Sequence, residues 1–150
     1  MLTSHFISFL AVISSVSLAS PIENEPVLVQ RQIRDWNCGG QPYTAAHVQA
    51  AFTDTINRAV HQNFAYKGKT PYPHEFRNGK PTQPEVNPDP CAGLSLQEFP
   101  ILKTGAHYTG GNPGPDRVVI GSSNPAGGVW QECFLMTHTG AKGNLFLKCT

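Results

Sequence analysis

The stretch TAAHVQAAFTDTINRAVH, residues 44–61, is the one segment of this sequence with a clear helical pattern. Its apolar residues recur every three or four positions, which places them on one face of an α-helix. Thr44 stands in front of the pattern, where a threonine side chain can cap the first turn. We therefore predict one amphipathic helix from Ala45 to about His61. Its apolar face would consist of Val48, Ala51, Phe52, Ile56, Ala59 and Val60.

Short strand-like runs follow the predicted helix as far as the C-terminus. Glycine and proline punctuate the gaps between these runs. Strands in series with short turns favour an antiparallel sheet, and a single helix then packs on one face of it. The predicted fold class is therefore α+β, with one amphipathic helix on a central antiparallel sheet. The predicted strands cover residues 72–77, 94–102, 116–121, 129–138 and 144–149.

The N-terminal segment has the pattern of a secretory signal. Residues 6–13 form an apolar core that is too short to span a bilayer, and small residues follow at a cleavage position. We predict a signal peptide over residues 1–19; a buried strand or a membrane anchor is the alternative. Residues 20–34 would be a pro-segment or a disordered N-terminus, and residues 35–150 one domain. No second apolar run follows, so we expect a secreted, extracellular mature protein that is not bound to a membrane.

Four cysteines lie in the predicted domain. An even number in a small secreted chain predicts two disulfides, for which three pairings are possible. We favour Cys38–Cys149 together with Cys91–Cys133, because the first bond would tie the start of the domain to its last strand. No two cysteines are close in sequence and no histidine stands at ligand spacing from them, so we expect no metal.

The charge of the chain is nearly balanced, with a formal net charge of +1. This balance argues against tight, non-specific binding of nucleic acid by a strongly basic surface. A polyanionic ligand would therefore need a local cluster of side chains.

Side chains on the predicted strands offer such a cluster. Because side chains alternate along a strand, Tyr72, His74 and Phe76 share one face of theirs. Glu98 points away from Phe99, which we expect in the core. Taken singly, each polar residue has a plainer interpretation, such as a surface carboxylate, an exposed ion pair or core packing. If the strand order allows it, one concave face would collect a phenol, two imidazoles, a carboxylate and a guanidinium, from Tyr72, His74, Glu98, Arg117 and His138.

Such a set of groups can move two protons around a phosphate and stabilise the charge that develops on it. We expect neighbouring cations to keep Glu98 ionised, and a neighbouring carboxylate to help keep the two imidazoles protonated. The rate of such a reaction should have a bell-shaped dependence on pH.

Several short motifs, taken together, resemble a known family. They are YPHEF at 72–76, EFPI at 98–101, PGPDRVV at 113–119 and THTG at 137–140, with NCGG at 37–40 and NLFLKC at 144–149. In this order they are similar to the fungal secreted guanyl- and purine-specific ribonucleases, which are relatives of the ribotoxins. The resemblance covers about residues 38–150, the whole predicted domain.

The resemblance implies a small α+β fold, the disulfide pairing favoured above, and a monomeric enzyme without metal or cofactor. It implies cleavage of single-stranded RNA by transesterification to a 2′,3′-cyclic phosphate, followed by hydrolysis, 3′ of guanine or another purine. Glu98 matches the base that takes the 2′-OH proton, and His138 matches the acid that protonates the 5′-oxygen. The remaining matches are His74 as the second imidazole, Tyr72 and Arg117 as phosphate donors, and Phe146 as the aromatic wall.

For base recognition the resemblance implies the loop after the Tyr72–Phe76 run. Phe76 would stack on the base, because every base has a π-face, and the backbone of Arg77, Asn78 and Gly79 would donate hydrogen bonds. Asn144 would help to shape the pocket. At the expected acidic position stands Lys80, which cannot accept a hydrogen bond; Glu85 is the alternative acid.

Two other functions stay open at this point. One is a ribotoxin-like secreted cytotoxin, although the loop of residues 78–91 has a single lysine where ribotoxins have long lysine-rich loops. The other is an effector that binds RNA without cutting it, against which the presence of all the matched catalytic residues argues.

Overall fold

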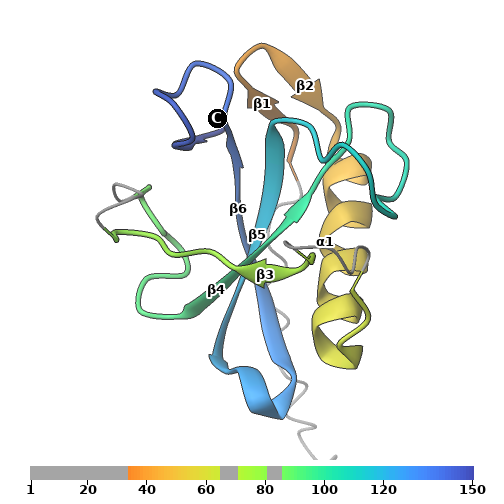
Figure 1. Cartoon of the computed structure of the whole chain (residues 1–150), viewed down its shortest axis with the longest axis vertical. Coiled ribbons are helices and arrows are strands. Elements are labelled where there is room, and N and C mark those ends of the chain that lie inside the picture. The colour runs from red at the N-terminus through yellow and green to blue at the C-terminus, as the bar shows by residue number, and fades with distance from the viewer. Residues whose placement is uncertain (1–33, 65–70, 81–85) are drawn as a thin grey trace, which may run out of the picture. The chain divides into compact units, whose positions relative to one another are not determined.

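The computed structural model describes residues 34–64, 71–80 and 86–150 (Figure 1). The predicted signal peptide, nearly all of the predicted pro-segment and Glu85 lie outside the described residues. The elements are β1 (Trp36–Cys38), β2 (Gln41–Tyr43), α1 (Ala45–His61), β3 (His74–Glu75), β4 (Ser95–Pro100), β5 (Asp116–Asn124), the short 3-10 helix η1 (Pro125–Gly127), β6 (Val129–Thr137) and β7 (Leu147–Lys148).

Helix α1 has the predicted bounds, and its ends show why. The Thr44 side chain accepts a hydrogen bond from the His47 amide at 3.3 Å, which caps the first turn. At the other end Gln62 adopts a left-handed conformation and donates its N–H to the Arg58 carbonyl. Val48 and Phe52 are buried against the sheet and Ala51, Ile56 and Ala59 pack beside them as expected, but the prediction was wrong for Val60, which is 42% exposed near the end of the helix.

The central sheet has five antiparallel strands in the order β3-β4-β5-β6-β7, and the fold class is α+β as predicted. Helix α1 lies along β5 and β6 in Figure 1. Alternation along β5 sends Val118 and Ile120 into the core under the helix, whereas Val119 joins a second apolar cluster with Phe134 and Met136. Both sides of the sheet are therefore packed, and the polar site described below lies beside the second cluster.

All five predicted strands differ from the observed bounds. The predicted strand 72–77 shrinks to two residues and 144–149 to another two, because turns occupy much of those runs; the Leu145 amide, for example, bonds to the Lys142 carbonyl. Strand β5 instead continues to Asn124. The β1–β2 hairpin was not predicted, since its strands are only three residues each. The sequence feature that indicates this hairpin is the Gly39-Gly40 pair at its turn, in which both glycines have positive φ.

Two disulfides join Cys38 to Cys149 and Cys91 to Cys133, which confirms the favoured pairing. The first bond spans 111 residues of sequence. Closing a loop of that size removes chain entropy worth about 4.7 kcal/mol from the unfolded state. Beside it, the Asn37 amide bonds to the Thr150 carbonyl at 2.6 Å and the Thr150 amide returns a bond at 3.0 Å, so the hairpin holds the C-terminus.

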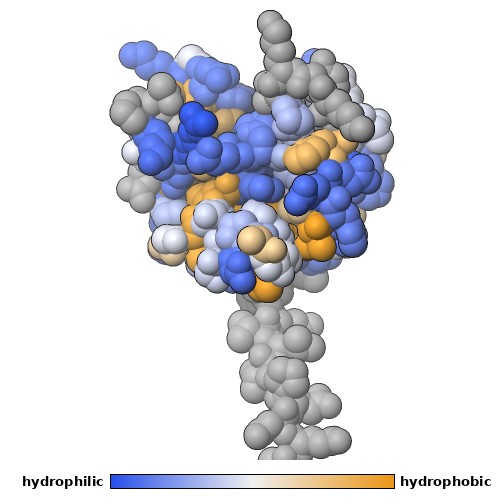
Figure 2. All heavy atoms as spheres, turned by 60° about the horizontal axis from the view of Figure 1, so that its bottom comes forward, coloured by the Kyte–Doolittle hydropathy of each residue, from blue (hydrophilic) through white to orange (hydrophobic). Residues whose placement is uncertain are grey.

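The surface shown in Figure 2 is mostly hydrophilic, with separate hydrophobic patches between the polar residues. Within the described residues the large exposed hydrophobic side chains are Val60, Phe64, Val129 and Leu147. None of the helices in this part of the chain combines the length and apolar character needed to cross a bilayer.

Candidate active site

Glu98 and His74 face each other across the β3–β4 pair. The two residues are directly paired in the ladder, and His74 Nε2 lies 3.2 Å from Glu98 Oε1. The opposite ring nitrogen, Nδ1, donates to the Glu75 carbonyl at 3.0 Å. That bond fixes the ring so that Nε2 is turned to the carboxyl group. The two groups are therefore within ion-pair distance, although Nε2 is buried and makes no hydrogen bond among the described residues.

Arg117 is held rigidly at the start of β5, with only 4% of its surface exposed. Its Nη1 donates to the carbonyls of Pro113, Gly114 and Asp116, at 3.3, 2.8 and 2.9 Å. Three acceptors on one nitrogen fix the guanidinium plane before any ligand arrives. Its Nε is buried and has no hydrogen-bond partner among the described residues, which leaves a donor for an anionic group.

His138 follows directly after β6 and is fixed from two sides. Its Nδ1 donates to the Leu145 carbonyl at 2.7 Å, which leaves Nε2 to exchange a proton with a ligand. The ring stacks on Phe146 at 3.8 Å between centroids, with an interplanar angle of 27°. Phe146 therefore supports the imidazole as well as lining the site.

Aromatic rings link these groups into one cluster. The Arg117 guanidinium carbon is 5.4 Å from the Tyr72 ring and 5.9 Å from the Phe146 ring. Tyr72 in turn lies 4.6 Å from His74 between ring centroids. Arg117 is thus linked through Tyr72 to the Glu98–His74 pair and through Phe146 to His138. The structure brings together all five residues that the sequence pointed to: Tyr72, His74, Glu98, Arg117 and His138.

The protonation states differ from the prediction. Burial raises the pKa of Glu98 from 4.5 to about 7, and the Arg117 charge opposes this shift without cancelling it. Burial likewise lowers the pKa of His74 and of His138, although each donates a hydrogen bond to a carbonyl. Burial also raises the pKa of Tyr72, with Arg117 acting against it. We had expected ionised Glu98 and protonated imidazoles; loss of hydration outweighs the neighbouring charges.

One oxygen of Glu98 is free to act on a ligand. Glu98 is 6% exposed, and its Oε2 has no hydrogen-bond partner among the described residues. A buried carboxyl oxygen without a partner is costly unless a ligand or water uses it. With a pKa near neutrality, this oxygen has the properties of a general base.

The residues predicted to hold a base are arranged less simply. Phe76 is 6% exposed and packs edge-on against Phe134 and Phe146, and it lines a pocket of about 460 Å³ together with Arg77, Asn78 and Lys80. The predicted strand 72–77 was wrong at Phe76, which follows β3 directly, and sequence alternation could not show that other aromatic rings lie against it. Asn144 is exposed at the turn before Phe146.

Hydrogen bonds join the start of the loop after β3 to its end. The Asn78 side chain accepts from the Val86 amide at 2.7 Å and donates to the Val86 carbonyl at 2.8 Å. Asn78 therefore shapes this loop with its side chain and offers a ligand only its backbone. Arg77 is exposed and its Nε bonds to Glu75 at 3.0 Å. Lys80 is exposed as well.

Sequence reasoning missed the main-chain acceptors of the site. The carbonyls of Pro113, Gly114 and Leu145 orient the catalytic candidates, and no residue-type pattern identifies a carbonyl. His107, to which we gave no role, lies outside the cluster with its Nδ1 3.5 Å from Asp54. Within residues 34–64, 71–80 and 86–150, no three His, Cys, Asp or Glu side chains are grouped so as to hold a metal ion.

Comparison with known proteins agrees with these observations. The family model described as ribonuclease matches residues 31–150. The chain is 37% identical over 150 residues to guanyl-specific ribonuclease F1 of Fusarium fujikuroi, with 100% of this chain and 98% of the relative covered. It is 35% identical over 125 residues to guanyl-specific ribonuclease T1 of Aspergillus oryzae, covering 83% and 85%. It is 39% identical over 113 residues to extracellular guanyl-specific ribonuclease Fl1 of Gibberella baccata, covering 75% and 93%.

Proposed function

Because the chain belongs to the ribonuclease family, we propose that it cleaves single-stranded RNA at the cluster around Arg117. The observation that carries the proposal is one buried guanidinium in contact with Tyr72, the neighbour of the Glu98–His74 pair, and with Phe146, on which His138 stacks. An in-line displacement at phosphorus needs a base on one side, an acid on the other and positive charge between them.

The first step begins at the ribose 2′-OH. The Glu98 carboxylate takes the hydroxyl proton, and the 2′-oxygen attacks phosphorus. His74, whose Nε2 lies 3.2 Å from the carboxyl group, assists this base and stabilises the developing charge. The charge that accumulates on the phosphate oxygens is met by Arg117 and by the Tyr72 hydroxyl.

The second part of the step releases the 5′-oxygen. His138 Nε2 gives its proton to that oxygen as the bond from phosphorus breaks, and a 2′,3′-cyclic phosphate remains. In the hydrolysis that follows, the roles reverse: His138 takes a proton from water, and Glu98 returns a proton to the 2′-oxygen. Protons balance over the two steps, so the residues end in their starting states.

We propose a preference for guanine on the 5′ side of the cut, supported by the three relatives above, all of which are named guanyl-specific. The ribotoxin-like and non-catalytic alternatives are not favoured by those relatives. We further propose that the enzyme is secreted and works as a monomer without metal, which fits a reaction that side chains complete alone.

The test is cleavage of GpC, ApC, CpC and UpC in the presence of a chelator. We expect GpC to be cleaved faster than each of the others by at least about 10-fold, because hydrogen bonds matched to one base are worth about 1.5 kcal/mol or more. Equal rates on all four would refute the base preference. Undetectable cleavage of all four and of polymeric RNA would refute the nuclease itself.

The pH dependence of kcat/KM tests the two proton-transfer roles. The pKa of Glu98 is about 7 and that of His138 is below its ordinary value. In the reactive form Glu98 is ionised and His138 is protonated, so the single proton sits on the residue with the lower pKa. We expect a bell-shaped profile that falls above about pH 7. In His138→Gln, only ionisation of Glu98 matters, so the small residual rate should rise through the same pH range. A residual rate that still falls there would contradict the assignment.

A further inference from the structure

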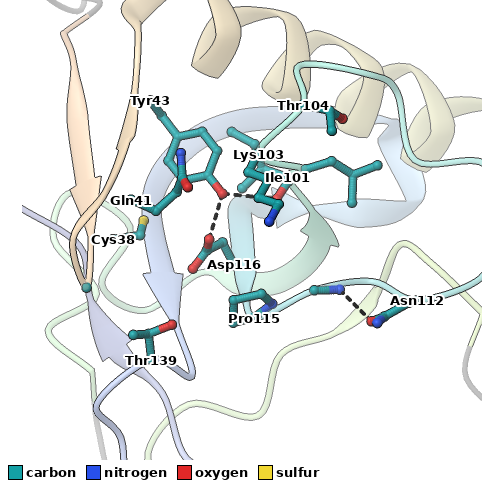
Figure 3. A pocket seen from close by; sticks show the side chains of 13 residues that line it. Cys38, Gln41, Tyr43, Ile101, Lys103, Thr104, Asn112, Pro115, Asp116 and Thr139 are labelled. Atoms are coloured by element: carbon teal, nitrogen blue, oxygen red, sulfur yellow. Dashed lines mark hydrogen bonds between the residues drawn. The ribbon is translucent and has the colours of Figure 1, made fainter.

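A cavity lies between the β1–β2 hairpin, the segment after β4 and the turn before β5 (Figure 3). It has a volume of about 500 Å³, within the range of sites for small molecules or single nucleotides. The β1–β2 hairpin, residues 101–104 and the turn of residues 112–116 form its walls. Its polar rim and walls include Gln41, Lys103, Thr104, Asn112 and Thr139. None of these residues has a role in the reaction proposed above.

The cavity and the catalytic centre share the same turn. Gly114 lines the cavity, and its carbonyl accepts the 2.8 Å bond from Arg117. Pro115 also lines it, and its carbonyl accepts from the His138 amide at 3.0 Å. Thr139, which directly follows His138, forms part of the wall. Gly114, Pro115 and Thr139 therefore connect the cavity to the backbone that holds Arg117 and His138.

This position fixes which end of an RNA chain would reach the cavity. The proposed base, Glu98, acts on the 2′-OH of the nucleotide upstream of the cut. The proposed acid, His138, protonates the 5′-oxygen of the nucleotide downstream. RNA that continues in the 3′ direction thus leaves from the side of His138, and Thr139, the next residue in the sequence, lines the cavity.

The lining chemistry fits a nucleotide. Lys103 is exposed, and no carboxylate of the described residues lies within ion-pair distance of it, so its charge is available for a phosphate. Ile101 and Pro115 give an apolar wall for a base. The floor holds Asp116, whose Oδ2 accepts from the Tyr43 hydroxyl at 2.6 Å. A carboxyl group at the floor disfavours a phosphate there, so the phosphate belongs at the rim with Lys103.

We propose that this cavity is a binding site for RNA downstream of the cut. Lys103 contacts the phosphate 3′ of the leaving nucleoside, and the next nucleotide occupies the cavity. The assignment rests on the proposed nuclease function and adds to it a preference for longer substrates.

The experiment compares GpC with GpCpA, which has one more phosphate and one more nucleoside downstream. We expect wild-type kcat/KM to be about 5-fold higher for GpCpA, the value of one exposed charge contact of about 1 kcal/mol. The slope of log(kcat/KM) against log salt should be steeper by about 0.7 for GpCpA, since one further single-strand phosphate is neutralised. Lys103→Ala should lose both differences and keep wild-type activity on GpC.

Lys142→Ala is the matched control. Lys142 is an exposed lysine near His138 that does not line the cavity, so its removal changes the net charge equally and should leave the GpCpA advantage intact. Gln41→Trp, which fills the cavity, should abolish the advantage while GpC cleavage reports that the protein is folded. Equal rates of the wild type on both substrates, or equal losses in Lys103→Ala and Lys142→Ala, would overturn the site. Failure of GpC cleavage by the wild type would instead refute the nuclease function.

Discussion

Replacing His138 by glutamine should lower kcat for GpC cleavage by about 10³-fold, within the range of 10² to 10⁴ for loss of a general acid. Glutamine can occupy the space above Phe146 and bond to the Leu145 carbonyl, but it has no proton to give to the 5′-oxygen. The other imidazole of the cluster, His74, lies beside Glu98 and is not placed to replace this acid. Single-turnover measurement of cyclic phosphate formation checks the effect on the chemical step.

Glu98→Gln should lower kcat less, by about 10²-fold. His74 Nε2 already lies 3.2 Å from the carboxyl oxygen and can take over as base. Changing His74 as well should then remove most of the remaining rate, so the two losses should not be additive. His107→Gln is the matched control, since His107 is exposed and outside the cluster. A folded His138→Gln enzyme within 10-fold of wild type would disprove the assigned acid.

The arrangement of the site could be anticipated from strand parity. Alternation separates Glu98 from Phe99, and the same rule separates Arg117 from Val118. Each polar side chain then belongs to the face opposite the helix, and only the strand order remained open. The order β3-β4-β5-β6-β7 places β3 beside β4 and so sets His74 against Glu98. The helix bounds were predictable for a similar reason, since Thr44 and the apolar stripe are local signals.

Properties that depend on packing could not be anticipated in this way. Whether Glu98 is ionised depends on the water removed by its neighbours, and sequence reasoning counted only the nearby charges. The covering of Phe76 depends on Phe134 and Phe146, which come from other strands. The downstream cavity likewise lies between segments far apart in the chain, and its main-chain walls have no sequence signature.

The second large effect concerns stability, and it follows from the buried carboxyl group. A group whose pKa is higher in the folded state than in the unfolded state binds its proton more tightly when folded. Its contribution to stability is complete below the unfolded value of 4.5 and is lost as the pH rises through the folded value of about 7. The shift of about 2.5 pKa units corresponds to roughly 3 kcal/mol at 1.36 kcal/mol per unit. The wild-type protein should therefore be less stable at pH 8, because Glu98 is then ionised while buried.

Glu98→Gln removes this penalty, because glutamine has nearly the shape of the protonated acid and cannot ionise. The gain in the free energy of unfolding over wild type should be near zero at pH 4.5 and reach about 3 kcal/mol at pH 8. Urea unfolding at pH 4.5, 6 and 8 measures it, and the pH dependence of all other groups cancels in the difference. Glu75→Gln is the control, since Glu75 is exposed and its ion pair with Arg77 is worth little. A gain that does not grow with pH would mean that Glu98 is ionised at little cost in the folded protein, and that the base of this enzyme is tuned by something other than burial.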